Sequence, residues 1–163
     1  MKISILLLLF LAGCANNNPR DIMPKPKYQV LDFGQLTIET PDGWKKFKPL
    51  SFEGFGGGIA IDSTDTLSFG IGQYSGILVK TDTAFMNYLR SNHNILEDTI
   101  DGHAAKLISP KKPGSGMIGI FIDSLWLHGQ RVEGFNMNGT HLKPINEQLF
   151  IRAIKTIRFH KDK

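Results

Sequence analysis

Apolar and polar residues alternate with a period of two along several short stretches of the chain, a pattern that predicts half-buried β-strands. In residues 33–40 (FGQLTIET), Leu36 and Ile38 share one face. The second clear case is residues 67–72 (LSFGIG), in which Leu67, Phe69 and Ile71 alternate with serine or glycine. Further strands are predicted at residues 59–61, 76–80, 100–109, 117–123, 130–137 and 156–159. Residues 117–123 are apolar on both faces, which is typical of an interior strand.

Two segments show helical spacing instead. Thr81 or Asp82 is suited to cap a helix that ends near Asn92, and its predicted apolar face consists of Ala84, Phe85, Tyr88 and Leu89. Pro144 is favoured at a first helical position and begins the second helix. The predicted apolar stripe of that helix consists of Ile145, Leu149, Phe150, Ala153 and Ile154. Few helices and consecutive strands predict an α+β fold, a mostly antiparallel sheet with two main helices packed on it.

The first residues follow a different pattern from the rest of the chain. Lys2 precedes an almost wholly apolar run over residues 3–12, and small residues follow it. This order predicts a secretory signal peptide over residues 1–13. The run is shorter than the roughly 20 apolar residues that a membrane-spanning helix needs, and it lacks the polar face of a helix packed on a core.

Leu11-Ala12-Gly13-Cys14 resembles the lipobox of bacterial lipoproteins. The resemblance implies a diacylglyceryl group on the Cys14 sulfur, cleavage before Cys14, and acylation of the new amino terminus with chains such as palmitate. Two or three acyl chains hold a protein firmly on a bilayer, so the membrane is the first expected partner. Residues 14–27 are polar and proline-containing and predict a flexible tether. Ala15, where an aspartate would signal inner-membrane retention in enteric-type lipoproteins, favours the outer membrane.

Charge limits the partners of the remaining domain, residues 28–163. The whole chain has a formal net charge of +4, but residues 1–27 carry four basic residues and one acidic residue. The domain therefore holds 15 basic and 14 acidic residues. A nearly neutral domain gives no support for nucleic-acid binding, which requires a clustered basic face. Its 136 residues suffice for a single domain with its own core.

Three segments resemble PsbP-like domains: FGQLTIETPDGWKKF (33–47), DGHAAKLI (101–108) and LFIRAIKTIRF (149–159). The family fold is an antiparallel sheet between helices, an α/β/α sandwich. Its members include photosystem extrinsic proteins, a nuclear-transport regulator and bacterial envelope lipoproteins. They share binding or scaffolding rather than one reaction, and the resemblance therefore implies a binding role without a catalytic motif.

The candidate contact residues lie around a glycine run at 54–58. No helix is predicted to follow this run, so it does not match a phosphate-binding loop, and we expect a loop or bulge. Phe52 and Phe55 flank it and, with Gly56 and Gly57, form a candidate contact surface for a partner or ligand. Trp44 is expected to cap the core beside a turn, with ligand stacking as the alternative.

Residues suited to catalysis are scattered. Asp62 and Asp65 (in DSTDT) predict a solvated hairpin turn, with a hard-cation site as the alternative. The five histidines lack metal-ligand spacing on one helix face. Asp101 and His103 would point to the same side of a strand, and a carboxylate there could orient an imidazole. We therefore expect no catalytic residues, no metal site and no cofactor.

Three function classes remain open. The leading hypothesis is a lipid-anchored, non-catalytic binding or accessory protein of the bacterial cell envelope that contacts an envelope or effector protein, for instance as an immunity protein or a scaffold. The second is a small-ligand-binding envelope lipoprotein with a cleft against residues 67–72. The third is a hydrolase that uses Asp101 and His103.

Overall fold

The computed structural model describes residues 27–48, 55–75 and 83–161. Cys14, Phe52 and the strand predicted at 76–80 lie outside these ranges. The elements follow in chain order as β1 (Tyr28–Asp32), β2 (Leu36–Pro41), β3 (Lys45–Phe47), β4 (Phe55–Ala60), β5 (Thr66–Gly72), α2 (Thr83–Asn92), β6 (His93–Ile100), β7 (His103–Pro110), β8 (Met117–His128), β9 (Arg131–Thr140), α3 (Pro144–Ile154) and β10 (Arg158–Phe159).

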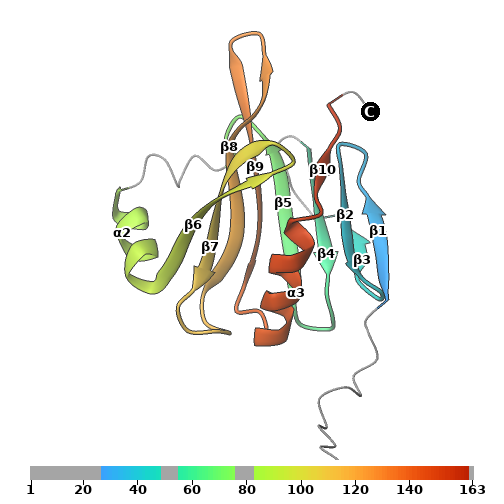
Figure 1. Cartoon of the computed structure of the whole chain (residues 1–163), viewed down its shortest axis with the longest axis vertical. Helices are drawn as coiled ribbons and strands as arrows, with labels where there is room; N and C mark the ends of the chain where they lie inside the picture. Colours follow the sequence, from blue (N-terminus) through green and yellow to red (C-terminus); the bar gives the residue numbers. More distant parts are fainter. Residues whose placement is uncertain (1–26, 49–54, 76–82, 162–163) are drawn as a thin grey trace, which may run out of the picture.

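The strands form two antiparallel sheets (Figure 1). The smaller sheet has the order β1-β2-β10, and the larger has the order β3-β4-β5-β9-β8-β7-β6. Most neighbouring strands of the larger sheet also follow one another along the chain. The exception is β5, which pairs with the distant strand β9 and places Phe69 opposite Met137. The α+β class predicted from the sequence is confirmed. The strand predicted at 117–123 is also confirmed as interior, because β8 lies between β9 and β7.

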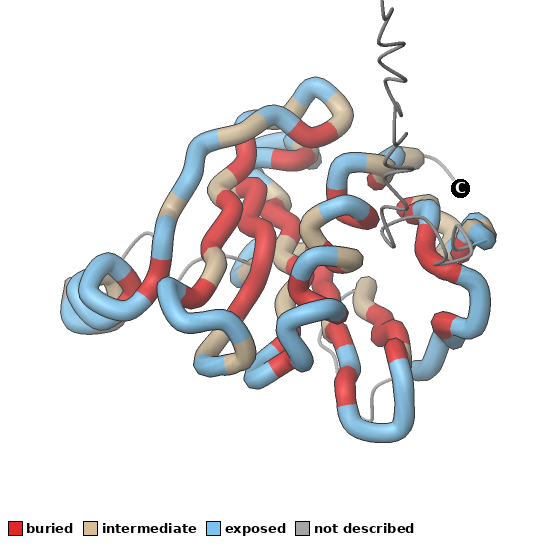
Figure 2. Tube along the Cα trace, turned by 60° about the horizontal axis from the view of Figure 1, so that its bottom comes forward, coloured by how far each residue is buried: buried red, intermediate tan, exposed pale blue. Residues whose placement is uncertain are grey.

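The main core lies between the two sheets and α3, where buried segments concentrate (Figure 2). Alternate residues of the larger sheet face it, as the period-two pattern requires, and they include Leu67, Phe69, Ile118, Ile120 and Ile122. The smaller sheet contributes Leu36 and Ile38, and α3 contributes Phe150 and Ile154, all fully buried. Burial of this apolar surface is the main term that stabilises the domain.

A second, smaller cluster lies on the opposite face of the larger sheet. There Leu89 of α2 packs with Ile108 and Phe121, and Met86 and Met117 are partly buried against them. Phe121 and its neighbour Ile120 belong to different clusters because successive strand residues point to opposite faces. The larger sheet therefore carries α3 on one face and α2 on the other.

Both helices are where the sequence predicts them, but their buried faces differ from prediction. In α2 the residues Ala84 and Tyr88 are exposed, and Leu89 carries the packing. In α3 the predicted stripe residue Ile145 is 60% exposed. Asn146 takes the buried position at that end, because it is turned toward two carboxylates of the β4–β5 turn.

Several predicted strand boundaries are wrong. The strand predicted at 117–123 runs on to His128, and two other predicted strands contain a turn. The strand predicted at 33–40 begins only at Leu36, because the chain turns back there and Phe33 N donates to the Leu36 carbonyl. The strand predicted at 100–109 contains a turn: Asp101 and Gly102 have φ values of 49° and 81°. This turn separates β7 from β6, a strand that the sequence pattern did not reveal.

The glycine run was expected to form a loop or bulge, and its described part is a strand. Phe55–Ala60 forms β4 and pairs with β5 in continuous register. Gly57 lies opposite Phe69, and a Cβ at Gly57 would come within 2.5 Å of the Phe69 ring. The ring of Phe47 covers Gly58 in the same way. These glycines are therefore required by close packing of aromatic rings, not by turn geometry.

Candidate functional site

Of the predicted contact residues that the structure describes, Trp44 and Gly57 are buried, and Phe55 and Gly56 are partly exposed. Trp44 is only 4% exposed and belongs to the main core, which agrees with the expected cap beside the turn and leaves little ring surface for a ligand. Gly57 is buried beneath Phe69. Phe55 is half-buried, and its ring centroid lies 6.1 Å from that of Phe69. Gly56 is also half-buried.

Asp101 and His103 do not form the side-by-side strand pair that the hydrolase hypothesis requires. Asp101 sits in the β6–β7 turn, and its Oδ2 accepts a hydrogen bond from Phe159 N at 2.8 Å. The His103 ring meets the Phe159 ring edge to face, with centroids 5.8 Å apart. Both residues thus fix the tip of the β6–β7 hairpin on β10. The expected arrangement of Asp101 and His103 on one side of a strand is wrong, because Asp101 and Gly102 form a turn.

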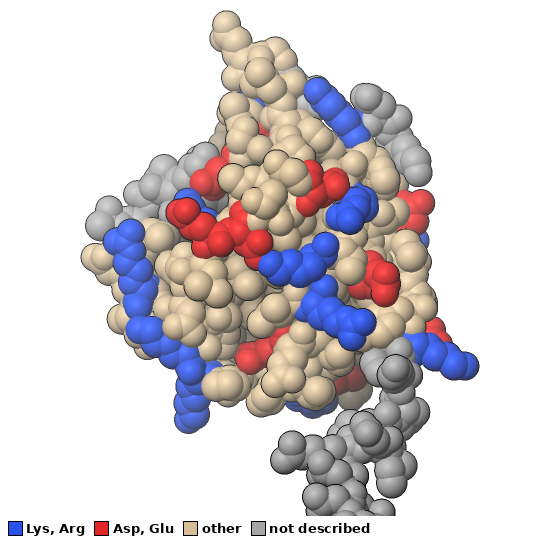
Figure 3. Space-filling view, in the orientation of Figure 1, with Lys and Arg blue, Asp and Glu red and all other residues tan. Residues whose placement is uncertain are grey.

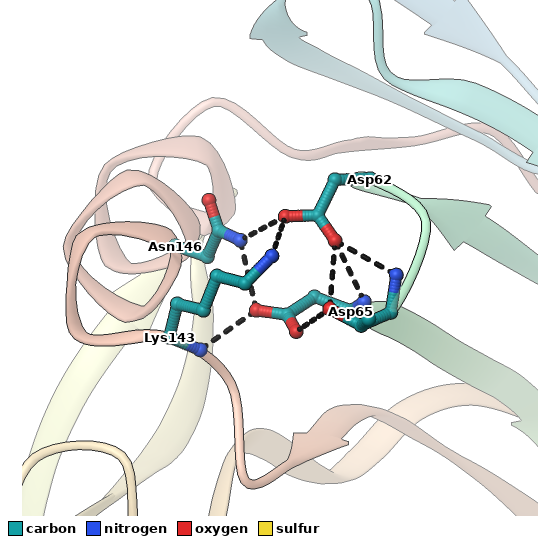
Figure 4. Close-up of polar contacts among 5 residues, drawn as sticks. Asp62, Asp65, Lys143 and Asn146 are labelled. Carbon is teal, nitrogen blue, oxygen red and sulfur yellow. Dashed lines mark hydrogen bonds and ion pairs between the residues drawn. The ribbon is translucent and has the colours of Figure 1, made fainter.

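A polar network joins the β4–β5 turn to the start of α3 (Figure 4). Asp62 Oδ1 accepts hydrogen bonds from the Thr64 and Asp65 backbone N–H groups at 2.9 and 3.0 Å. Asp62 Oδ2 accepts from Lys143 Nζ and Asn146 Nδ2, each at 2.9 Å. Asp65 Oδ2 accepts from Lys143 N at 2.7 Å and from Asn146 Nδ2 at 2.8 Å. The two carboxylates therefore occupy the N-terminal end of α3, where the helix dipole favours negative charge.

The network keeps both carboxylates ionised. The hydrogen bond from Lys143, with those from the turn backbone, holds the pKa of Asp62 far below its ordinary 3.8. Burial opposes ionisation of Asp65, but hydrogen bonds from Asn146, Lys143 N and Thr64 outweigh it and lower its pKa. The bond to Asp62 in turn raises the pKa of Lys143.

These carboxylates are unsuited to acid–base chemistry near neutral pH. A general acid or base needs a pKa close to the working pH, and the pKa values of Asp62 and Asp65 are displaced in the opposite direction. Every carboxylate oxygen of the pair already accepts at least one hydrogen bond. The hairpin turn expected from the sequence is confirmed, but it is not fully solvated, because Asp65 is only 6% exposed. We call the network of Asp62 and Asp65 with Lys143 and Asn146 the clamp on α3.

The clamp predicts an acid-sensitive stability. Asp62 contributes stability fully above its unfolded pKa of 3.8 and loses it as the pH falls below that value toward the folded pKa. We expect the urea midpoint of the wild type to fall between about pH 5 and about pH 3, and that of Asp62→Asn to fall less. Asp42→Asn, in the exposed β2–β3 turn, is the matched control. Equal acid losses in wild type and Asp62→Asn would contradict the clamp.

The larger sheet splits between β7 and β8. These strands pair only where Lys106–Ile108 meets Gly119–Phe121, whereas β7 pairs with β6 along its whole length. Beyond Phe121, β8 has a bulge between Ile122 and Trp126, and the β6–β7 hairpin curves toward β10 (Figure 1). We call the resulting opening the β7–β8 cleft. It has a volume of about 500 Å³ and is lined by Glu97, Asp98, Thr99, Ala104, Ala105, Lys106, Phe121, Asp123 and Ser124.

Charged side chains border the β7–β8 cleft. Lys106 Nζ lies 3.2 Å from Asp123 Oδ2, so an ion pair links the two strands just where their backbone pairing ends. Glu97 stands opposite Lys106 in the β6–β7 register. Asp98 pairs with Lys155 at the end of α3. Figure 3 shows the acidic side chains gathered over this part of the sheet, next to basic ones.

A second cavity lies at the end of β5. Its volume is about 330 Å³, and its lining residues are Gln35, Phe55, Ile71, Gly72, Gln73, Tyr74 and Glu133. This is where the sequence suggested a cleft against residues 67–72. The lining is mixed, not apolar, and the buried Gln35 Oε1 has no hydrogen-bond partner in the described part of the chain.

Residues 27–48, 55–75 and 83–161 hold neither a metal-ligand cluster nor a membrane-spanning helix. Within these ranges, histidine, cysteine, aspartate and glutamate side chains form no group of three that is placed to hold a metal ion. No helix in the same ranges combines the length and apolar character that crossing a bilayer demands.

Comparison with known proteins adds no relative. No protein-family model matches the chain, and no curated protein matches it.

The β7–β8 cleft could not be predicted from the sequence. Its lining residues come from three strands, and the charges of Glu97, Lys106 and Asp123 become neighbours only through strand register.

Proposed function

We propose that the protein is a lipid-anchored, non-catalytic binding protein of the bacterial cell envelope. The observation that carries the proposal is the motif Leu11-Ala12-Gly13-Cys14 directly behind the apolar run of residues 3–12. Cys14 is the chain's one cysteine and would carry the lipid. Ala15 favours the outer membrane, and the anchor makes the membrane the first partner.

The shape of the domain suits an anchor at its amino-terminal end. The described chain enters β1 at Tyr28, at one end of the molecule, and the β8–β9 hairpin projects from the opposite end (Figure 1). Leu127 and Val132 near the hairpin tip are 60% and 42% exposed. A protein held through the residues before Tyr28 would direct this hairpin away from the membrane, toward an envelope or effector protein.

Further support for a binding role comes from the chemistry of the domain. Asp62 and Asp65, the carboxylates with lowered pKa values, hold the start of α3. The β7–β8 cleft has the size of a ligand site. We also propose the finer PsbP-like arrangement, supported by the two helices on opposite faces of the larger sheet. Immunity and scaffold roles are the two protein-binding versions of this proposal.

Small-ligand binding is the second candidate function. The observation that favours it is the cavity at the end of β5, lined by Phe55, Tyr74 and the unpartnered Gln35 Oε1. A bound molecule that donates a hydrogen bond to Gln35 would satisfy this buried acceptor.

The anchor is tested by Cys14→Ala. We expect wild-type protein to enter the detergent-rich phase on Triton X-114 separation and to co-sediment with outer membranes, because acyl chains contribute about 0.8 kcal/mol for each buried methylene. Cys14→Ala should remain in the aqueous phase. Asn16→Ser, which leaves the cysteine intact, is the matched control, and a Cys14→Ala protein that partitions like wild type would overturn the proposal.

A further inference from the structure

We infer that the end of the domain at which β1 starts rests on anionic phospholipid headgroups through three basic residues, Arg90, Lys111 and Lys112. We call these residues the basic corner. The inference deepens the proposed function and rests on it. The acyl chains at Cys14 would hold the protein on the bilayer, and the basic corner would orient the domain there.

The basic corner is formed where α2 ends beside the turn between β7 and β8. The turn is attached to the helix, because Lys111 N donates to the Asn92 carbonyl at 3.0 Å. Lys111 Nζ donates to the Arg90 and Ser91 carbonyls at 3.1 and 3.0 Å, at the helix end where the dipole favours positive charge. Lys112 follows in the turn, and all three basic residues are exposed. Figure 3 shows basic side chains in a row at this corner, at the lower left.

Among the described residues, no carboxylate forms an ion pair with the basic corner. Glu147, which contacts the same turn, is only 6% exposed, and its Oε1 accepts a hydrogen bond from Gly114 N at 3.0 Å. Asp62 and Asp65, in the β4–β5 turn at the same end of the molecule, are held in the clamp on α3, where Lys143 pairs with Asp62. The three positive charges of the basic corner therefore face solvent without a matching negative charge.

The basic corner lies at the end of the molecule where the anchor would be. The β7–β8 turn and the start of β1 share this end, opposite the β8–β9 hairpin (Figure 1). Residues 15–27, as the flexible tether that their composition predicts, would span about 20 Å between the lipid and the domain. At the start of β1, Lys27 and Lys45 are exposed beside a single exposed carboxylate, Asp42. The end that faces the bilayer thus carries an excess of exposed positive charge.

A tether of this length makes a weak electrostatic contact effective. Each lysine or arginine beside an anionic leaflet favours the contact about fivefold. The attraction fades within a Debye length, about 10 Å at 0.1 M salt, so it acts on the end of the domain that is closest to the bilayer. Because the tether keeps the basic corner near the headgroups, the contact forms within one anchored molecule. It would also direct the β8–β9 hairpin away from the membrane.

The test places the lipidated, 15N-labelled chain in nanodiscs that contain a lipid with a paramagnetic headgroup. One kind of disc is made of phosphatidylcholine, and the other of equal parts of phosphatidylcholine and phosphatidylglycerol. At an ionic strength of about 0.01 M, the anionic discs should broaden the amide signals of residues 111–116 about fivefold more than the neutral discs. The difference should vanish at about 1 M salt, where screening is strong. The signals of Leu127 and Val132 should stay sharp in both kinds of disc.

A charge-removal variant tests the basic corner itself. Arg90→Gln combined with Lys112→Gln should weaken the contact with anionic discs about twenty-five-fold, because each charge contributes about fivefold. Lys111 is retained, because its ammonium group is bonded to the end of α2. Arg131→Gln combined with Lys161→Gln removes two exposed charges elsewhere, one on the β8–β9 hairpin and one beyond β10, and is the matched control.

Equal broadening in the two kinds of disc would overturn the inference and would indicate an acidic protein as the partner of the basic corner instead. Broadening centred on the β8–β9 hairpin would contradict it, as would a control variant that loses the contact as fully as Arg90→Gln with Lys112→Gln. Failure of the proposed function is measured separately, because stable retention in the phosphatidylcholine discs depends on the acyl chains and not on the basic corner.

Discussion

Replacement of Phe69 with alanine is expected to lower the free energy of unfolding by about 4 kcal/mol. Phe69 is fully buried on β5, and its ring contacts the rings of Phe33, Phe55 and Phe135 at centroid distances of 4.8, 6.1 and 6.3 Å. The alanine would remove these contacts and leave a cavity above Gly57, where the glycine provides no side chain to fill it.

Urea unfolding followed by circular dichroism measures this effect. Phe69→Leu is the matched control, because it retains most of the buried volume and should cost about 1.5 kcal/mol. A loss of under about 1.5 kcal/mol for Phe69→Ala, or equal losses for the two variants, would contradict the packing described for the β4–β5 pair.

The second large effect is expected for Asp65→Ala, about 3 kcal/mol of lost stability. Asp65 is 6% exposed, and it accepts hydrogen bonds from Lys143 N and from Asn146 Nδ2. Its removal would leave Lys143 N at the start of α3 without this acceptor and would loosen the contact between the β4–β5 turn and the helix. A buried donor that loses a charged partner costs more than the average hydrogen bond.

The same unfolding experiment tests this prediction. Thr66→Ala, at the exposed neighbouring position, is the control and should change stability by no more than about 0.5 kcal/mol. An Asp65→Ala protein as stable as Thr66→Ala would show that the carboxylate does not hold α3 in place.

The elements that could be predicted from the sequence are those whose pattern is local. In β5, Leu67, Phe69 and Ile71 alternate with small residues, and all three are buried as expected. Pro144 marks the start of α3 because proline suits a first helical position. Residues 117–123 are apolar on both faces because two separate clusters cover the two sides of β8.

The elements that were missed depend on distant residues. The strand β6 shows no clean alternation, because it lies at the edge of the larger sheet and six of its eight residues are at least partly exposed without a repeating order. The glycines of β4 suggested a loop. Their reason lies in the rings of Phe69 and Phe47, which reach Gly57 and Gly58 from neighbouring strands.

The candidate sites were even less visible in the sequence. The partners of Asp62 and Asp65 are about 80 residues away, at Lys143 and Asn146, so the sequence predicted a solvated turn without these partners. The β7–β8 cleft depends on where a ladder stops and a bulge begins, and no residue type marks either point. By contrast, the motif Leu11-Ala12-Gly13-Cys14, which we propose as the lipid-attachment site, is contiguous and requires no fold for its interpretation.

The central claim, that the protein is anchored through Cys14, is tested most directly by mass spectrometry of the protein purified from its membrane. We predict a chain that begins at Cys14, lacks residues 1–13 and carries acyl chains on its first residue. A chain that retains residues 1–13, or a Cys14 thiol that reacts freely with iodoacetamide, would contradict the account.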